Sequence, residues 1–203
     1  VAWGTFCDWY LELIKPALQG DDGNAATETR AACAWALDQI LLLLHPVMPF
    51  ISEELWHHMS PVPRDGLIRA AWPRFSNDIQ DEKADAEMDW TIRLITQIRA
   101  VRSELNVPPG AKIPLILESA DAVNIARLEA QSDQIMRLAR IDSHRIGDGS
   151  SAGQTGAVQI VLDEATVVLP LAGVIDIRQE RDRLAREVEK TDGEIAKIDK
   201  KLG

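Results

Sequence analysis

The residues best suited to chemistry in this chain are basic side chains spaced for contact with phosphate groups. Arg99 and Arg102 are three residues apart within 98–104, so on a helix they project from the same face. Five further cations crowd the start of the last segment: Arg178, Arg181, Arg183, Arg186 and Lys190. Such groups would neutralise the phosphates of a nucleic acid backbone. Neighbouring carboxylates, Glu104 and Glu187 among them, leave an ordinary salt-bridged surface as the alternative.

Other motifs predict no catalytic, metal or cofactor site in this chain. His57 and His58 are adjacent, and adjacent side chains on a helix diverge by about 100°, which prevents convergence on one metal ion. The glycine-rich segment 147–156 has no lysine and precedes a predicted strand, whereas a phosphate loop needs a Gly-Lys-Ser/Thr sequence that opens a helix. We therefore expect this segment to be a flexible connector.

Composition limits the classes of function that remain. The 203 residues carry 22 Lys and Arg against 32 Asp and Glu, a net charge of −10. This excludes a uniformly basic nucleic-acid binder but leaves room for a local basic face. Cys7 and Cys33 lack Cys-x-x-Cys spacing, so we expect two buried, reduced cysteines in a cytoplasmic protein. The apolar run around 40–44 is far shorter than the roughly 20 residues of a membrane span.

The elements that position these residues begin with a helical bundle, which we expect over residues 1–80. Apolar side chains at helical spacing predict a first helix over 3–14, ended by Pro16 and the glycines that follow. Helices are also expected over 27–44 and 51–59, on either side of a proline-containing break.

A second part, over residues 81–170, changes from helices to mixed structure. A long helix is predicted over 82–105, a strand over 113–117 and a single helix over 122–140. The β-branched runs 158–162 and 166–169 predict a hairpin. The predicted fold class is therefore mainly α, with a small α/β unit after the bundle.

The last part, residues 171–203, has the regular spacing of a coiled coil. Apolar residues fill seven of nine seam positions: 174, 177, 181, 184, 188, 191, 195, 198 and 202, with Arg181 and Thr191 as the exceptions. A seam needs a partner helix, and none follows in this sequence. We therefore expect a fragment of a larger protein, with the first helix of a truncated arm and dimerisation through its unpaired seam.

Several stretches resemble a known family. Residues 6–12, FCDWYLE, followed by Lys15-Pro16, resemble the first anticodon-bundle helix of the class I aminoacyl-tRNA synthetases for branched aliphatic amino acids. Residues 44–56, LHPVMPFISEELW, resemble the hinge between two helices of that bundle. Residues 98–108 and 169–187 resemble the connecting helix and the start of the C-terminal arm in the valyl enzymes. The chain is therefore identified as a member of the valyl-tRNA synthetase family, from its C-terminal portion.

The resemblance implies an RNA-binding module. The bundle would approach the anticodon stem-loop through Phe6, Trp9 and Lys15, and Arg99 and Arg102 would contact phosphates. The arm, with its five cations, would reach the outer corner of the tRNA. Phe6 and Trp9 serving only as core residues is the alternative for those two rings.

The same resemblance implies what the complete enzyme does. It would ligate L-valine to tRNA(Val) with ATP and Mg²⁺, whereas this chain, which has no counterpart of the ATP-site signatures, is expected to be inactive alone and to hold no cofactor. Its expected partners are tRNA(Val) and the remaining catalytic and editing domains, with no DNA and no membrane. Two alternatives stay open: the anticodon domain of an isoleucyl or leucyl enzyme, and a structural coiled-coil module that binds no RNA.

Overall fold

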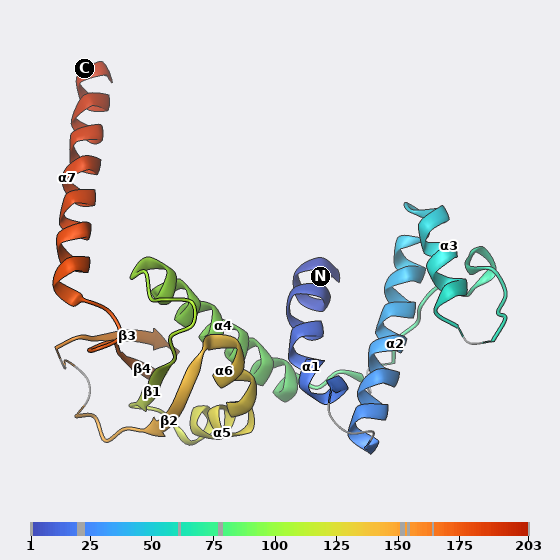
Figure 1. The fold of residues 1–203 in the computed structure, drawn as a ribbon. Helices are drawn as coiled ribbons and strands as arrows, with labels where there is room; N and C mark the ends of the chain where they lie inside the picture. The colour runs from blue at the N-terminus through green and yellow to red at the C-terminus, as the bar shows by residue number, and fades with distance from the viewer. Residues whose placement is uncertain are drawn as a thin grey trace. The chain divides into compact units, whose positions relative to one another are not determined.

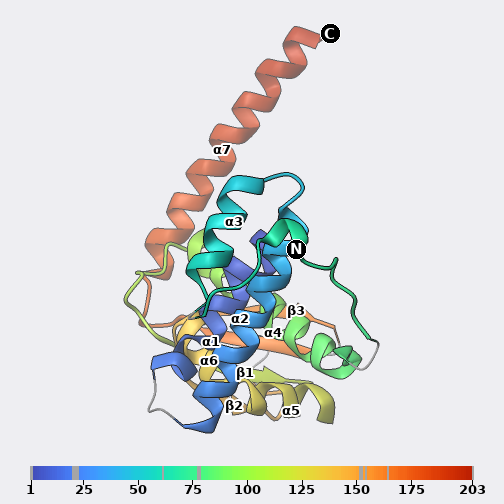
Figure 2. The same ribbon diagram turned by 90° about the vertical axis from the view of Figure 1, so that its right-hand side faces the viewer.

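The computed structural model describes residues 2–19, 23–60, 62–76, 79–150, 153, 155–163 and 165–202. The chain divides into two compact units, Val1–Asp81 and Glu82–Gly203. The first unit is helical, and the second combines helices with a small sheet (Figures 1 and 2). The predicted fold class, mainly α followed by a small α/β unit, is confirmed.

In the residues that the structure describes, the first unit contains a π-helix, three α-helices and a 3-10 turn. A π-helix, Ala2–Tyr10, continues directly into α1, Leu11–Gln19. The expectation that Pro16 ends the first helix is wrong, because Pro16 lies inside α1. A proline removes one backbone hydrogen bond, and packing of α1 against α2 offsets that loss. The remaining elements are α2, α3 and the 3-10 turn: Asn24–Leu44, Pro49–His58 and Leu67–Arg69.

A buried serine fixes the bend between α2 and α3. Pro49 opens α3, where its missing N–H costs nothing. The Ser52 side chain is 1% exposed, and its hydroxyl donates to the Met48 carbonyl at 2.7 Å. The same oxygen lies 2.8 Å from Nδ1 of His45 at the end of α2. These bonds make the bend a defined hinge, in the segment that resembles the family most closely.

The second unit contains a four-stranded mixed sheet in the order β2-β1-β4-β3. Strand β1 pairs parallel with β2 and antiparallel with β4, which forms a hairpin with β3. The predicted strand and hairpin are confirmed, whereas β2 was missed. Its sequence, IDSHRI, is polar except at its ends, so no alternating pattern marks it. The strands are Ile113–Glu118 (β1), Ile141–Ile146 (β2), Ala157–Leu162 (β3) and Ala165–Pro170 (β4).

Two short helices, instead of the predicted single helix over 122–140, connect the parallel strands. They are α5, Ala122–Ala130, and α6, Ser132–Ala139, and they separate at Gln131. The Gln131 side chain donates to Oε1 of Glu87 at 2.6 Å, which ties the break to the neighbouring helix α4. The break between α5 and α6 therefore depends on a contact with another helix, and the local sequence does not show that contact.

Helix α4, Glu82–Glu104, supplies much of the core of this unit. It packs against α5, α6 and β3. Trp90, Leu94, Ile95 and Ile98 on α4 are fully buried, as are Leu115 and Leu117 on β1. Each such side chain contributes roughly 1.5–3 kcal/mol through the apolar area that it buries. The helix ends at Glu104, and Asn106, two residues later, has a left-handed φ of 49°.

The last helix, α7, spans Ile177–Leu202 (Figure 1). The predicted seam begins too early, because Val174 lies in a turn before the helix starts. Seam residues Val188, Ile195 and Ile198 are more than half exposed. In the part of the chain that the structure describes, no second helix covers them. The pairing of this helix in a coiled coil therefore remains a prediction.

No helix within the described ranges is long and apolar enough to cross a membrane. The two cysteines form no disulfide, but the expectation that both are buried is wrong, because Cys7 is exposed and Cys33 is half-buried. Cys7 lies in the π-helix Ala2–Tyr10, which contributes no fully buried residue to the first unit. The partial burial of Cys33 raises the pKa of its thiol.

Candidate functional site

The candidate residues of the first helix differ in how far they reach solvent. The Phe6 ring stacks on Tyr10, with centroids 5.4 Å apart and planes inclined by 23°. Phe6 and Trp9 are half-buried. Lys15 is exposed and forms an ion pair with Glu12, one turn earlier in α1. Of these three residues, Lys15 is the one at the surface.

Arg99 and Arg102 have distinct environments although both lie on α4. Arg99 is exposed, and its Nε donates to the Leu138 carbonyl at 3.0 Å, near the end of α6. Arg102 is only 7% exposed, and its Nη2 donates to the carbonyls of Pro108 and Ala111 at 3.2 and 2.8 Å. Arg102 therefore holds the loop after α4 and is not an ordinary surface cation.

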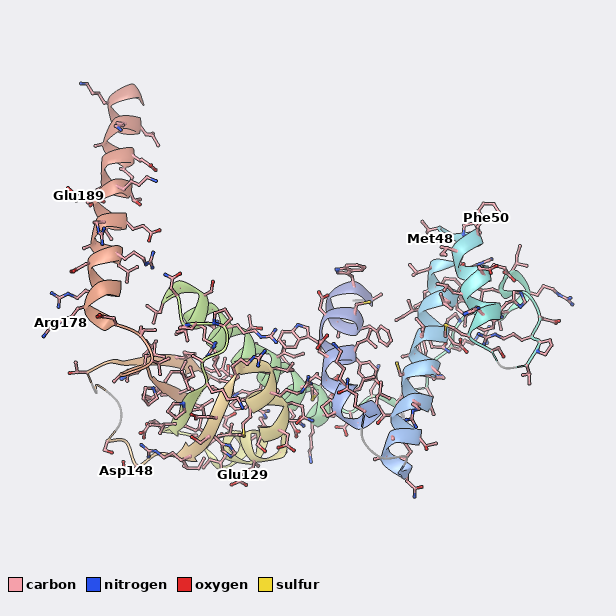
Figure 3. All side chains as sticks on the ribbon, viewed as in Figure 1. Met48, Phe50, Glu129, Asp148, Arg178 and Glu189 are labelled. Carbon is pink, nitrogen blue, oxygen red and sulfur yellow. The ribbon has the colours of Figure 1, made fainter. Side chains whose placement is uncertain are left out.

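The five cations at the start of α7 form a partly neutralised surface. Arg183 pairs with Glu187 at 2.7 Å and also donates to the Glu104 carbonyl at 3.0 Å, which ties α7 to the end of α4. Lys190 lies 3.9 Å from Glu194. Arg178, Arg181 and Arg186 are exposed; Figure 3 labels Arg178 at the first turn of α7. The salt-bridged alternative thus holds for Arg183 and Lys190.

A hollow lies at the foot of α7, beside the end of α4. Its volume is about 480 Å³, and Arg183 and Arg186 line it together with Asn106 and Asp176. The Asp176 carboxylate accepts the backbone N–H of Arg178 at 3.0 Å, which caps the first turn of the helix. Charge of both signs lines this hollow, so it does not favour an anion strongly.

The histidine pair forms no metal site. His57 Nε2 lies 3.0 Å from Oε1 of Glu53, and the same carboxylate oxygen accepts the backbone N–H of Leu67 at 3.0 Å. Partial burial pushes the pKa of Glu53 up, but its hydrogen bonds from Leu67, His57 and Ile68 outweigh that effect and hold the pKa below its usual value. Within the described ranges, no cluster of three or more His, Cys, Asp or Glu side chains could hold a metal ion.

The glycine-rich segment 147–156 lies partly outside the described residues. Where it is described, Glu118 at the end of β1 is buried and accepts the backbone N–H of Gly149. A Cβ added at Gly147 would lie 2.2 Å from the same carboxyl group. Figure 3 labels the neighbouring Asp148. Glu118 therefore fixes the start of this segment, a role that the sequence did not indicate.

Sequence analysis also missed two arginines. Arg64 lies over the ring of Trp56, 3.6 Å from its centroid, and forms two hydrogen bonds with Asp38 at 2.9 and 3.2 Å. These contacts join α2 to the segment after α3. Arg140 follows α6 with a left-handed φ of 58° and lines a pocket with Arg99 and Arg102. Neither arginine lies in a motif, so only the fold brings each to its neighbours.

Comparison with known proteins identifies the family. A family model described as "Anticodon-binding domain of tRNA ligase" matches residues 1–117. The chain is 50% identical over 205 residues to the valine–tRNA ligase of Zymomonas mobilis, and 47% over 204 residues to that of Caulobacter vibrioides. Each match covers 99% of this chain but only 23% and 22% of the relative, so the chain spans about a fifth of these proteins. The residues matched make up more than half of the chain, which therefore belongs to the family of anticodon-binding domains of tRNA ligases.

Proposed function

We propose that this chain is the tRNA-binding C-terminal region of a cytoplasmic valine–tRNA ligase. The observation that carries the proposal is identity of 47–50% with valine–tRNA ligases over nearly the whole chain. It favours the valyl enzymes over the isoleucyl and leucyl ones. The complete protein would ligate L-valine to tRNA(Val) with ATP and Mg²⁺, using catalytic and editing domains that lie in the part of the relatives outside this match.

The proposal assigns a task to each of three parts. Residues 1–80 would form the anticodon-binding bundle, 81–170 the small α/β part and 171–203 the arm. The division of the chain after Asp81 supports the first boundary. Anticodon bases are unstacked and are read by aromatic and polar side chains, which the half-buried Phe6 and Trp9 and the exposed Lys15 supply.

Charge explains how an acidic chain would bind RNA. From residue 171 onward eight basic residues balance eight acidic ones, so the whole net charge of −10 lies in residues 1–170. Binding must therefore rest on local groups of cations, such as the exposed Arg178, Arg181 and Arg186 at the foot of α7. Neutralisation of three phosphates gives an affinity that falls about 20- to 40-fold between roughly 50 and 200 mM salt.

A direct titration tests the proposal. The 203-residue chain is added to fluorescent valine tRNA and to a non-cognate tRNA at both salt concentrations, and the dissociation constants are read from anisotropy. We expect tighter binding of the valine tRNA and a steep loss of affinity with salt. Equal affinity for the two tRNAs would refute valine specificity within this chain, and absence of binding at low salt would refute RNA binding.

A matched pair of variants locates the contact in the first unit. Lys15→Gln removes an exposed cation from α1 of the bundle, and Lys83→Gln removes an exposed cation from the first turn of α4. We expect the first substitution to weaken binding of valine tRNA several-fold and the second to leave it within a factor of two. Equal effects would contradict the assignment of the bundle to the anticodon.

One observation favours a second candidate function, a protein-interaction module. The seam residues Val188, Ile195 and Ile198 are 60%, 51% and 56% exposed. An apolar stripe of this kind on a charged helix pairs with a second helix when one is available. Sedimentation velocity over a hundredfold range of protein concentration, without RNA, tests this: dimerisation that Val188→Glu and Ile195→Glu together abolish would support it.

A further inference from the structure

A pocket in the second unit collects positive charge in a chain that is otherwise acidic. It lies between the last turns of α4 and α6, and its volume is about 380 Å³. Arg99, Arg102 and Ser103 line it from α4, and Arg140 lines it from the end of α6. Val107 and Pro109 come from the loop after α4, and Leu138 and Ala139 of α6 complete the lining. The described lining thus holds three guanidinium groups and a hydroxyl, and no carboxylate.

Arg102, which lines this pocket, has a buried donor that the described protein groups do not satisfy. The side chain is more than nine-tenths buried. Its Nη2 donates to two loop carbonyls, but its buried Nη1 has no hydrogen-bond partner among the described residues. An unpaired donor at a buried charge costs free energy, so it marks a place where an acceptor belongs.

Arg140 adds a second unfavourable interaction to this pocket, a repulsion between two positive charges. Burial, and then the positive charge of Arg140, hold the pKa of Arg102 below its usual value. In the described part of the chain the Arg140 side chain makes no hydrogen bond or ion pair. Its backbone is left-handed, a conformation that favours glycine or asparagine at the end of a helix. The chain thus places a cation beside another cation, in a backbone conformation that opposes it.

Helix capping accounts for only part of this arrangement. Cations are favoured near the C-terminus of a helix, and Nε of Arg99 caps α6 through the Leu138 carbonyl. Capping therefore explains why an arginine is found at position 99. It does not explain the unsatisfied Nη1 of Arg102, or the choice of arginine at position 140. A bound anion with several acceptor oxygens explains both, because it would accept from more than one guanidinium group and screen their mutual repulsion.

We propose that this pocket binds a phosphate group of the RNA backbone. The proposal rests on the proposed function for the identity of its ligand, since a tRNA supplies phosphodiesters, whereas the anion site itself rests on the pocket alone. Guanidinium groups suit phosphate oxygens because their donors form paired hydrogen bonds. The small α/β part would then contact tRNA, in addition to the bundle and the arm.

Substitutions at Arg140 test the site without damage to the fold. Arg140→Gly and Arg140→Asn remove the charge and insert residues that suit a left-handed backbone. Arg145→Gln is the matched control, because it removes an exposed arginine from β2 of the same unit outside the pocket. Affinity for valine tRNA is measured at several salt concentrations. The Nε–Hε NMR resonances of the arginines are followed during addition of inorganic phosphate, with chloride as the reference.

We expect both Arg140 variants to bind tRNA about tenfold more weakly, with the salt slope reduced by about 0.7–0.9 for one lost phosphate contact. Arg145→Gln should change affinity less than twofold. Phosphate should shift the Nε–Hε resonances of Arg99 and Arg140 in the unmodified chain, and should no longer shift that of Arg99 in the Arg140 variants.

Other outcomes would overturn either the RNA contact, the anion site or the proposed function. Unchanged tRNA affinity in both Arg140 variants would overturn the RNA contact and leave the proposed function standing. Equal losses in the Arg140 and Arg145 variants would overturn it as well, because general electrostatics would then suffice. If the unmodified chain binds no tRNA, the proposed function fails, and phosphate-induced shifts at Arg140 alone decide for or against the anion site.

Discussion

The left-handed arginine after α6 gives a sharp test of stability. Arg140 has φ 58° and ψ 50°, its N–H donates to the Met136 carbonyl, and its own carbonyl accepts the N–H of Ile113 at 3.2 Å. Arg140→Gly keeps both backbone bonds. It removes only the side chain, so its effect on the free energy of unfolding follows from backbone conformation and charge.

The magnitude comes from two opposing terms. A residue with a Cβ costs about 1–2 kcal/mol in the left-handed region. Glycine costs about 0.5–1 kcal/mol in extra backbone entropy of the unfolded chain. Arg140→Gly should therefore stabilise the second unit by about 0.5–1 kcal/mol, and loss of the repulsion with Arg102 adds to this gain. The corresponding rise in Tm is roughly 2–5 °C.

Arg137→Gly is the matched control, three residues earlier in the same helix. It removes the same side chain type, but from a position inside α6. Glycine inside a helix costs about 1 kcal/mol, so this variant should be less stable than the unmodified chain. Urea unfolding measures both free energies, and hydrogen exchange over residues 113–146 assigns the change to the second unit. Destabilisation of similar size in both variants would refute the reasoning.

Two further substitutions probe contacts within the second unit. Gly147→Ala places a Cβ 2.2 Å from the Glu118 carboxyl group, so it should destabilise the unit by about 1–3 kcal/mol in urea unfolding, whereas Gly110→Ala, with no heavy atom within 4 Å, should cost less than about 0.5 kcal/mol. Similar costs for the two would contradict the close approach. Asp163→Asn removes the carboxylate charge and one of the two acceptor oxygens that Arg93 contacts at 2.9 and 2.8 Å, and because both side chains are 40% or more exposed the loss should stay below about 1 kcal/mol. Arg93 holds the pKa of Asp163 below its usual value, so the contribution of the pair is complete above about pH 4 and is lost as pH falls through the lowered pKa. The two chains should therefore differ in stability at pH 7 and converge as the pH falls through that lowered pKa, and a difference that stays constant as the pH is lowered would contradict the assignment.

Periodicity predicted the long elements well, because their burial is continuous along the sequence. The apolar spacing of Trp90, Leu94, Ile95 and Ile98 is the spacing of α4 itself, and these residues are the fully buried ones. The hairpin strands, which are rich in β-branched residues, were predicted equally well from the sequence. Strand β2 was not predicted, because its middle is polar and its backbone is held by the neighbouring β1.

The candidate site was less predictable, for a physical reason. The spacing of Arg99 and Arg102 correctly placed both on α4, yet exposure differs between them because the loop at Pro108 and Ala111 folds over the second. Arg140 carries no sequence signal at all. Its role depends on a left-handed backbone and on the approach of α6 to α4, both of which are properties of the folded chain.

We propose that this chain recognises the anticodon region of a valine tRNA. Nuclease footprinting of end-labelled valine tRNA, with the chain at about ten times its dissociation constant, tests the claim most directly. We expect protection of the anticodon loop, weakened in Lys15→Gln, together with protection of backbone positions that disappears in Arg140→Gly. A saturated complex whose anticodon loop stays as open to cleavage as in free tRNA would contradict it.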